Sequence, residues 1–293
     1  MTKTLKWTID FNLLLALFII IWGAWVRASG SGAGCGEHWP LCNGDVIPPS
    51  PSVKTLIELS HRISSAIFGL TVLGALLMAR STQHRGLLRS LKGCLFFTIT
   101  EALIGAVLVK RGLVVDNDSA LRALVIAIHL INTLGLLYYL AQSALWVRAP
   151  QSTLRPLSWR DDRLFYLCFC LFMLAGASGA IAALGNTLFP ETSLIEGVKR
   201  DFEASSHFLI KLRVFHPLLA IGLATSLLGF AHRDLPPWSG ALKSGVFIAV
   251  TWGVINWFLL APTWGALLHL LIADCLFVAF VCYHFWSRAT PTS

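Results

Sequence analysis

Four histidines lie inside separate apolar stretches of this 293-residue chain: His61, His129, His216 and His269. Each is about 5 to 10 residues from one end of its stretch, a depth of roughly 8 to 15 Å at the rise of a helix. Two neutral imidazoles that face each other at one level are the ligands of a bis-histidine haem iron. We therefore expect two haem pockets, one between His61 and His129 and the other between His216 and His269.

The residue three positions before the first histidine differs between the two pairs. Glu58 precedes His61, whereas Arg213 precedes His216, and this spacing places both members on one face of a helix. A carboxylate beside a metal can move protons or stabilise a cationic carbon, whereas an arginine binds a propionate. We predict that Glu58 is catalytic and that the second pocket holds a resident haem. The alternative for Glu58 is an ion pair with Arg62.

Other polar residues in or near the apolar stretches are candidates for supporting roles. The basic residues that we predict to bind haem propionates are Arg27, Arg62, Arg122, Lys211 and Arg213. Their alternative is ordinary snorkelling at the membrane boundary. Glu101 and Asp274 lie inside apolar stretches, where each could orient a ligand imidazole or simply join two helices. The sequence leaves both alternatives open.

The composition indicates that these residues lie in a membrane. Hydrophobic residues make up 56% of the chain and charged residues 13%, and the mean hydropathy is +0.70. Eight stretches approach the length that spans a bilayer, about 20 residues. They cover residues 9–27, 54–79, 93–110, 121–147, 164–184, 206–230, 244–260 and 264–286. The predicted fold class is therefore an all-α integral membrane protein with eight transmembrane helices.

The eight stretches divide into two similar sets of four. Residues 1–150 and 151–293 each carry histidines in their second and fourth stretches. We predict two pseudo-symmetric four-helix bundles, related by an axis along the membrane normal. A single intramembrane histidine often only bonds a neighbouring helix, but four at one depth favour ligation. Pro217 is expected to kink its helix just after His216.

The distribution of charge predicts the orientation of the chain. Lys and Arg residues lie mainly on the face shared by the two termini, which predicts that both termini are cytoplasmic in a bacterial-type cell membrane or an equivalent energy-transducing membrane. The net charge of +8 then reflects this topology. The sequence lacks the dense basic and aromatic pattern of a nucleic-acid-binding surface, so we predict no nucleic-acid partner. Cleavage of the first stretch as a signal peptide is disfavoured, because Arg27 interrupts the cleavage region.

Two of the seven cysteines differ from the others. Cys35 and Cys42 lie in a loop rich in Gly and Pro on the predicted outer face, where an oxidising compartment favours a disulfide. Two free thiols or a redox-active pair are the alternatives. The remaining five lie in apolar stretches, where a thiol behaves as a small hydrophobic side chain.

Taken with these motifs, the sequence resembles the haem A synthase family, membrane enzymes that convert haem O to haem A for haem-copper oxidases. The resemblance covers nearly the whole chain. It rests on Gly30-Ser31-Gly32 leading to Cys35, on Trp39-Pro40-Leu41-Cys42-Asn43-Gly44, on Glu58-x-x-His61-Arg62, and on His129, His216 and His269. Some members carry a second cysteine pair in the later outer loop, whereas residues 185–205 contain none here. We expect that loop to cap the second pocket.

The resemblance implies oxidation of the C8 methyl of haem O to a formyl group through hydroxylation. It also implies that His61 and His129 bracket substrate haem O with Glu58 at the reaction centre, and that His216 and His269 hold a haem B cofactor. The expected partners are the lipid bilayer, an unidentified electron-transfer protein, and haem O synthase or a second copy of the chain.

Three other functions compete with this hypothesis. A di-haem cytochrome b acting in electron transfer or quinol oxidation is the main alternative, although such a carrier would normally place its haems near opposite faces. The farnesyltransferase that makes haem O is disfavoured, because the sequence lacks a pair of Asp-rich motifs for magnesium and diphosphate. A transporter or scaffold with structural histidines would bind no haem.

Overall fold

The computed structural model describes residues 1–149, 151–232 and 235–290, so the predicted boundary at residue 150 lies outside the described residues. Within this part, eight helices are long and apolar enough to cross a membrane, which confirms the predicted all-α membrane fold. They are α1 (Lys3–Ala28), α2 (Val53–Arg80), α3 (Arg85–Lys110), α4 (Ala120–Arg148), α5 (Arg163–Leu188), the span Phe208–Phe230, α9 (Trp238–Phe258) and α10 (Thr263–Arg288).

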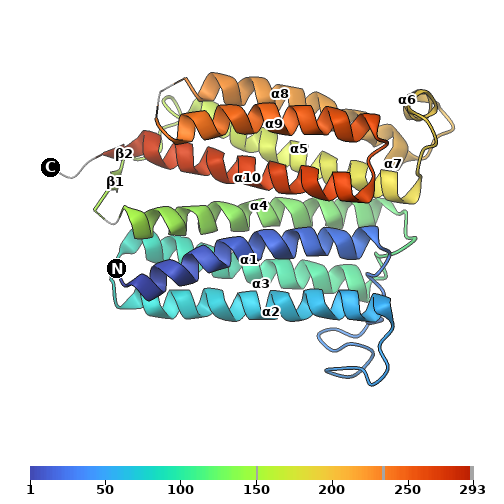
Figure 1. Ribbon diagram of the computed structural model, residues 1–293, viewed down its shortest axis with the longest axis horizontal. Helices are drawn as coiled ribbons and strands as arrows, with labels where there is room; N and C mark the ends of the chain where they lie inside the picture. Colours follow the sequence, from blue (N-terminus) through green and yellow to red (C-terminus); the bar gives the residue numbers. More distant parts are fainter. Residues whose placement is uncertain (150, 233–234, 291–293) are drawn as a thin grey trace.

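The long helices run side by side and form two groups (Figure 1). Helices α1 to α4 contact one another, and α5, α8 (Phe215–Phe230), α9 and α10 form the second group. The groups meet where α4 packs against α5 and α10, and where α1 packs against α10. The symmetry axis that the sequence suggested remains a prediction.

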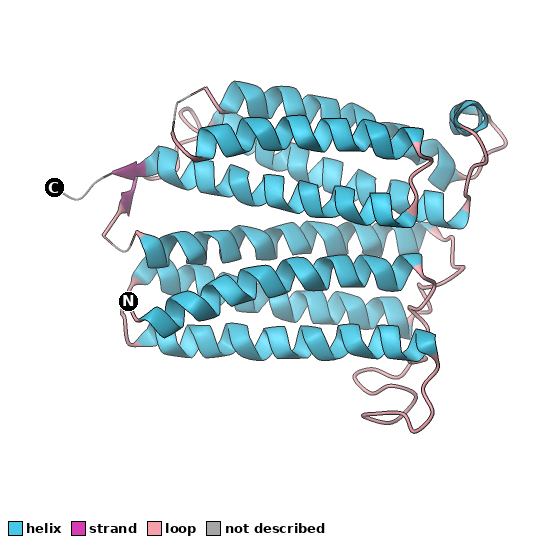
Figure 2. Cartoon of the chain, in the orientation of Figure 1, coloured by secondary structure: helices cyan, strands magenta, loops and turns pink. Residues whose placement is uncertain are grey.

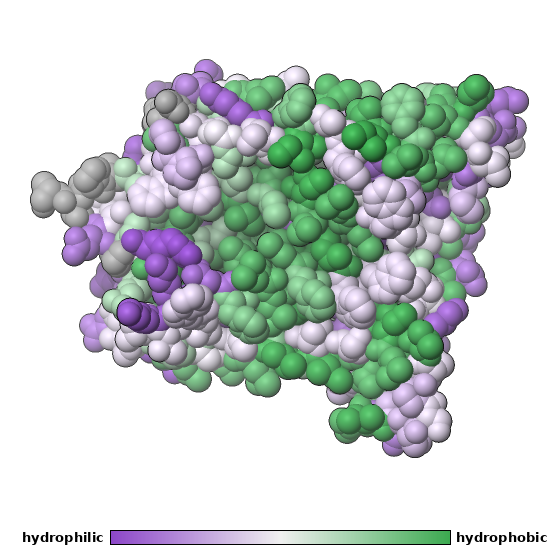
Figure 3. Space-filling view, viewed as in Figure 1, coloured by the Kyte–Doolittle hydropathy of each residue, from purple (hydrophilic) through white to green (hydrophobic). Residues whose placement is uncertain are grey.

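Side-chain burial matches a protein surrounded by lipid. A broad apolar belt covers the middle of the visible face, and the hydrophilic residues gather toward the two ends (Figure 3). Large apolar side chains along the helices are exposed, including Leu14, Leu70 and Phe247. Buried aromatic side chains instead fill the contact between α5 and α10, where Phe172 and Phe277 pack edge to face. The apolar exposed surface therefore indicates contact with the bilayer.

Several helices extend beyond the apolar stretches that predicted them. Helix α1 begins at Lys3 and not at residue 9, α3 begins at Arg85 and not at residue 93, and α9 begins at Trp238 and not at residue 244. Caps explain the first two cases, because Thr2 and His84 accept hydrogen bonds from backbone amides of the first turn. Hydropathy reports the lipid-facing part of a helix, whereas backbone hydrogen bonds continue into its polar ends.

The sixth span is interrupted before His216, and not after it as predicted. It consists of α7 (Phe208–Lys211), the 3-10 turn η1 (Leu212–Val214) and α8. Pro217 lacks an N–H, and its ring crowds the carbonyl four residues earlier, which belongs to Arg213. The disturbance therefore falls on the preceding turn.

Short elements complete the chain at the two ends of the bundle. Helix α6 (Leu194–Phe202), which the sequence did not predict, lies in the loop after α5 at the end where the histidine-bearing helices begin (Figure 1). At the opposite end, β1 (Thr153–Leu154) pairs antiparallel with β2 (Ala289–Thr290) (Figure 2). The strand pair ties the link between the two groups to the end of α10.

Candidate functional site

The four histidines lie on α2, α4, α8 and α10, at similar distances from the ends of their spans. His61 is eight residues after Val53, His129 nine after Ala120, His216 eight after Phe208 and His269 six after Thr263. All four spans begin at the same end of the bundle (Figure 1). The common depth predicted from the sequence is therefore present in the folded chain.

Each imidazole turns its Nδ1 edge toward the protein. The Nδ1 atoms of His61, His129 and His269 are buried, although each residue as a whole is only half-buried. His216 Nδ1 lies 3.0 Å from the carbonyl oxygen of Ala175 on α5. This arrangement leaves Nε2 as the atom available to a ligand, as expected for an imidazole that binds metal through one nitrogen.

The pair in the second group has the spacing of two ligands on one iron. The ring centroids of His216 and His269 are 6.1 Å apart, and the ring planes are nearly perpendicular at 82°. Two imidazoles bound at about 2 Å on opposite faces of one metal ion have centroids roughly 6 Å apart. The residues present therefore fit a bis-histidine haem.

Glycines on the neighbouring helices make room for three of the four rings. A Cβ added to Gly23 would lie 2.9 Å from Cε1 of His61, and one added to Gly179 would lie 2.9 Å from Cε1 of His216. At Gly253 the same distance to His269 is 3.1 Å. Any side chain at Gly23 or Gly179 would push the imidazole aside. These positions were not predicted from the sequence, where their only signal is a glycine inside an apolar helix.

The fourth histidine has a carboxylate as its neighbour. Nδ1 of His129 lies 2.5 Å from Oε2 of Glu101 on α3, and the Thr133 hydroxyl donates to Oε1 of the same carboxylate at 2.8 Å. Of the two alternatives that the sequence left open for Glu101, the structure favours a group that faces a candidate ligand imidazole. Asp274 is buried on α10, and its Oδ2 has no hydrogen-bond partner among the described residues.

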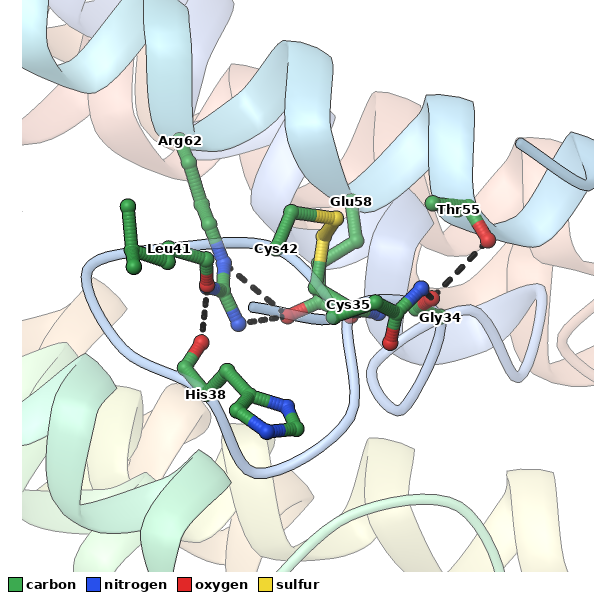
Figure 4. Close-up of polar contacts among 9 residues, drawn as sticks. Gly34, Cys35, His38, Leu41, Cys42, Thr55, Glu58 and Arg62 are labelled. Atoms are coloured by element: carbon green, nitrogen blue, oxygen red, sulfur yellow. Dashed lines mark hydrogen bonds and ion pairs between the residues drawn. A yellow bond between two sulfur atoms is a disulfide. The ribbon is translucent and has the colours of Figure 1, made fainter. Parts of the chain in front are cut away.

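Glu58 anchors the loop that follows α1. Its Oε2 accepts a hydrogen bond of 2.8 Å from the backbone N–H of Cys35, and its Oε1 forms an ion pair of 2.5 Å with Arg62 (Figure 4). The ion pair with Arg62, which the sequence left open as the alternative to catalysis, is therefore present, and the Glu58 carboxylate in it is buried. Glu58 is still one helical turn from His61, so its catalytic role remains a prediction beside this second role.

The same loop is closed by a disulfide between Cys35 and Cys42, as predicted. Arg62 Nη1 donates to the carbonyls of His38 and Leu41, and the Thr55 hydroxyl donates to the carbonyl of Gly34 (Figure 4). Because Arg62 already bonds Glu58 and two carbonyls, it would have to release some of these partners to bind a propionate.

Arg27 and Arg122 are better placed for an anion. Arg27 donates to the Ala183 carbonyl and the Thr187 hydroxyl, both on α5 in the other group, and Arg122 donates to two loop carbonyls. Arg122 is buried, and its Nε has no partner in the part of the chain that the structure describes. Within that part neither guanidinium forms an ion pair with a carboxylate, so the positive charge of each could pair with a propionate.

Arg213 and Lys211 face the segment that contains α6. The Arg213 guanidinium bonds Asp201 at 2.9 Å, Glu191 at 2.9 Å and Asn186 at 3.1 Å, and Lys211 Nζ donates to the Ala204 carbonyl. Burial raises the pKa of Asp201 above its usual value despite the nearby arginine. The segment is thus held to α7 and η1 by charge, and the predicted propionate role of Arg213 would compete with these bonds.

Comparison with known proteins identifies the relatives of the chain. The family described as cytochrome oxidase assembly protein (COX15-CtaA) matches residues 6–281. A Thermus thermophilus protein named protoheme IX farnesyltransferase is 42% identical over 285 residues, which are 92% of this chain and 46% of that protein. The chain therefore spans less than half the length of this relative.

Two other relatives are named heme A synthase. The protein from Staphylococcus haemolyticus is 29% identical over 216 residues, which are 70% of this chain and 69% of that protein. The protein from Bacillus cereus (strain AH187) is 39% identical over 114 residues, 38% of this chain and 37% of that protein.

Proposed function

The chain belongs to the cytochrome oxidase assembly family (COX15-CtaA), and we propose that it is a haem A synthase. In this proposal it oxidises the C8 methyl of haem O to a formyl group by way of the alcohol. The observation that carries the proposal is the presence of two histidine pairs at one depth. Among the described residues, a carboxylate contacts an imidazole in the first pair, Glu101 at His129, and Glu58 lies one helical turn before His61. Two heme A synthases among its relatives support the same function.

We assign the second histidine pair to a resident haem B. The 6.1 Å centroid distance between His216 and His269 suits two axial ligands, and the Ala175 carbonyl would hold the Nδ1 proton of His216. When bound, the haem supplies one-electron redox chemistry to the site. Gly179 and Gly253 leave the space that the two rings need.

We assign substrate haem O to the first pair. His61 and His129 would hold the substrate between α2 and α4, and Arg27 and Arg122 would bind its propionates at the outer boundary. Glu58 would take or give a proton at the reacting carbon, since the residue lies one helical turn before His61 on α2. The loop closed by Cys35 and Cys42 would cover this reaction centre and exclude water.

A di-haem cytochrome b that transfers electrons or oxidises quinol is the alternative function. The bis-histidine spacing of His216 and His269 is the one observation that favours it, because an electron carrier would have the same spacing as a synthase. The farnesyltransferase name belongs to the whole Thermus protein, more than half of which lies outside the match. Since this chain lacks the pair of Asp-rich motifs, we do not propose prenyl transfer for it.

The test is to express the chain in a host that makes haem O but not haem A, and to analyse its extracted haems by chromatography and mass spectrometry. Haem A or its hydroxylated precursor is the expected result. Haem B alone, in a host shown to contain haem O, would favour the cytochrome. A colourless protein would overturn both functions. The full-length chain with His61→Ala is the matched control and should yield haem B without haem A.

A further inference from the structure

Glu101 distinguishes His129 from the other three histidines. Its carboxylate lies 2.5 Å from Nδ1 of His129, and its side chain is 18% exposed, so water screens this contact poorly. The Thr133 hydroxyl, one turn after His129 on α4, donates to the other carboxylate oxygen at 2.8 Å. Glu101 is therefore held by α4 through both of its oxygens while it faces the imidazole.

The other histidines have neutral or no partners at the same atom. Nδ1 of His216 faces the backbone carbonyl of Ala175, with the Ser178 hydroxyl farther away at 3.5 Å. For His61 and His269, the described residues provide neither a hydrogen-bond partner nor an ion-paired carboxylate at Nδ1, whereas His129 has the carboxylate of Glu101. Among the described residues, a carboxylate thus lies behind Nδ1 of only one of the four candidate ligands, and that ligand is in the pocket assigned to the substrate.

We propose that Glu101 is a positioning residue that makes His129 a stronger electron donor to iron than the ligands of the second pocket. The inference rests on the proposed function, because it requires a haem between His61 and His129. A carboxylate on the outer nitrogen of a ligand imidazole fixes the ring and raises the basicity of the other nitrogen. A more basic axial ligand stabilises ferric over ferrous iron and lowers the reduction potential of the haem.

This difference sets a direction for electron transfer between the pockets. A haem held by His129 would give up an electron more readily than one held by His216 and His269. The haem of the first pocket would then be the donor that is oxidised, and the haem of the second pocket the acceptor that is reduced. The carbonyl at His216 lacks the full charge needed for the same effect. If Glu101 only joined α3 to α4, its charge would leave the potential of the haem unchanged.

The test is a redox titration of the protein in detergent with added haem O. The titration is monitored through the optical spectrum and the low-spin EPR signal. The signal lost in His129→Ala identifies the haem of the first pocket. Glu101→Gln keeps the shape of the side chain but removes its charge. We expect at least a tenfold fall in the ferric-to-ferrous ratio at a fixed potential, a positive shift of about 59 mV for a one-electron couple.

Two further variants keep the test independent of folding. Glu101→Asp retains the charge but withdraws it from His129, and we expect a smaller positive shift. Ser178→Ala, beside His216, is the matched control and should leave the first haem unchanged. A normal potential and EPR signal in both Glu101 variants, with haem bound, would overturn the inference but not the proposed synthase. A wild-type protein with no haem at His129 would overturn both.

Discussion

The two helix groups carry opposite charges at the same position, near the end of the bundle where the histidine-bearing helices begin. In the first group, Glu58 lies three residues before His61 and binds the loop through Cys35 and Arg62. In the second group, Arg213 lies three residues before His216 and binds Glu191 and Asp201 of the segment around α6. The side chain one turn before the histidine therefore anchors, in both groups, the segment that we propose to cover the pocket: residues 29–52 in the first group and residues 185–205 in the second.

This comparison explains how the second covering segment is held without cysteines. The first loop is closed by Cys35 and Cys42, whereas residues 185–205 contain no cysteine. In place of a disulfide, Arg213 holds this segment by bonding two carboxylates and the Asn186 side chain. The disulfide closes the first loop covalently whatever the charge state of Glu58, although Glu58 also bonds Cys35 and Arg62. The second segment depends on charges and is the easier one to open.

Removing one ligand from each group is expected to separate the two pockets most strongly. His216→Ala should remove nearly all bound haem B, because one of two axial ligands is lost, whereas His61→Ala should retain haem B and lose haem A formation. The measurements are the haem-to-protein ratio and the extracted haems. His232→Ala, an exposed histidine at the other end of the molecule, is the control. Full haem B content in His216→Ala would break the assignment of the second pocket.

Glu58 is expected to give the next largest effect, confined to the first group. A positioned general acid or base contributes about 100-fold to 10,000-fold, so Glu58→Gln should lower haem A formation by at least about 100-fold with haem B unchanged. The amide oxygen can still accept the Cys35 N–H, so this anchor of the loop is kept, whereas the amide NH2 cannot accept from Arg62. Glu58→Ala removes both the carboxylate that would transfer a proton and the acceptor that anchors the loop. Full turnover in Glu58→Gln together with loss in Glu58→Ala would show that anchoring alone matters.

The glycines behind the rings should produce intermediate effects that again differ by group. Gly179→Ala places a Cβ 2.9 Å from His216 and should lower the haem B content several-fold. Gly23→Ala does the same to His61 and should lower haem A formation while haem B stays bound. Gly222→Ala is the control, since nothing lies within 4 Å of its added Cβ. Equal effects of the three substitutions would point to general helix destabilisation.

The disulfide should matter less than the groups it covers. Replacing Cys35 and Cys42 by serine removes a covalent constraint on a short loop. We expect the free energy of unfolding to fall by about 2 kcal/mol. Because the Cys35 N–H still bonds Glu58, we expect a lower melting temperature and a several-fold loss of haem A formation, with haem B retained. A thermal melt beside the haem analysis measures both. Loss of haem B would contradict the separation of the two groups.

The smallest effect is expected from the ion pairs of the second covering segment. Glu191→Gln removes one of the two carboxylates at Arg213, and Asp201 keeps the other contact. We expect haem B to dissociate a few-fold faster into apomyoglobin, with little change in haem A formation at saturating haem. Glu196→Gln, which removes a carboxylate of the same segment that does not contact Arg213, is the control. An unchanged dissociation rate would show that the segment does not gate the second pocket.

Part of the molecule could be predicted because its physical cause is local. Hydropathy over about 20 residues identified all eight spans, since a bilayer imposes length and apolarity on any helix that crosses it. The depth of the four histidines followed by counting residues along those spans. The disulfide followed from two cysteines seven residues apart in a loop rich in Gly.

Other features depend on which side chains meet across helices, and the sequence does not encode these contacts locally. The partners of Glu58, Glu101 and Arg213 come from the loop after α1, from α4 and from the α6 segment, and only tertiary packing places them within hydrogen-bond distance. The interruption of the sixth span fell before His216, because the ring of Pro217 acts on the preceding turn. The amino-acid order alone was enough to locate the helices and their functional side chains, whereas the packing of the helices sets which charged group faces each imidazole.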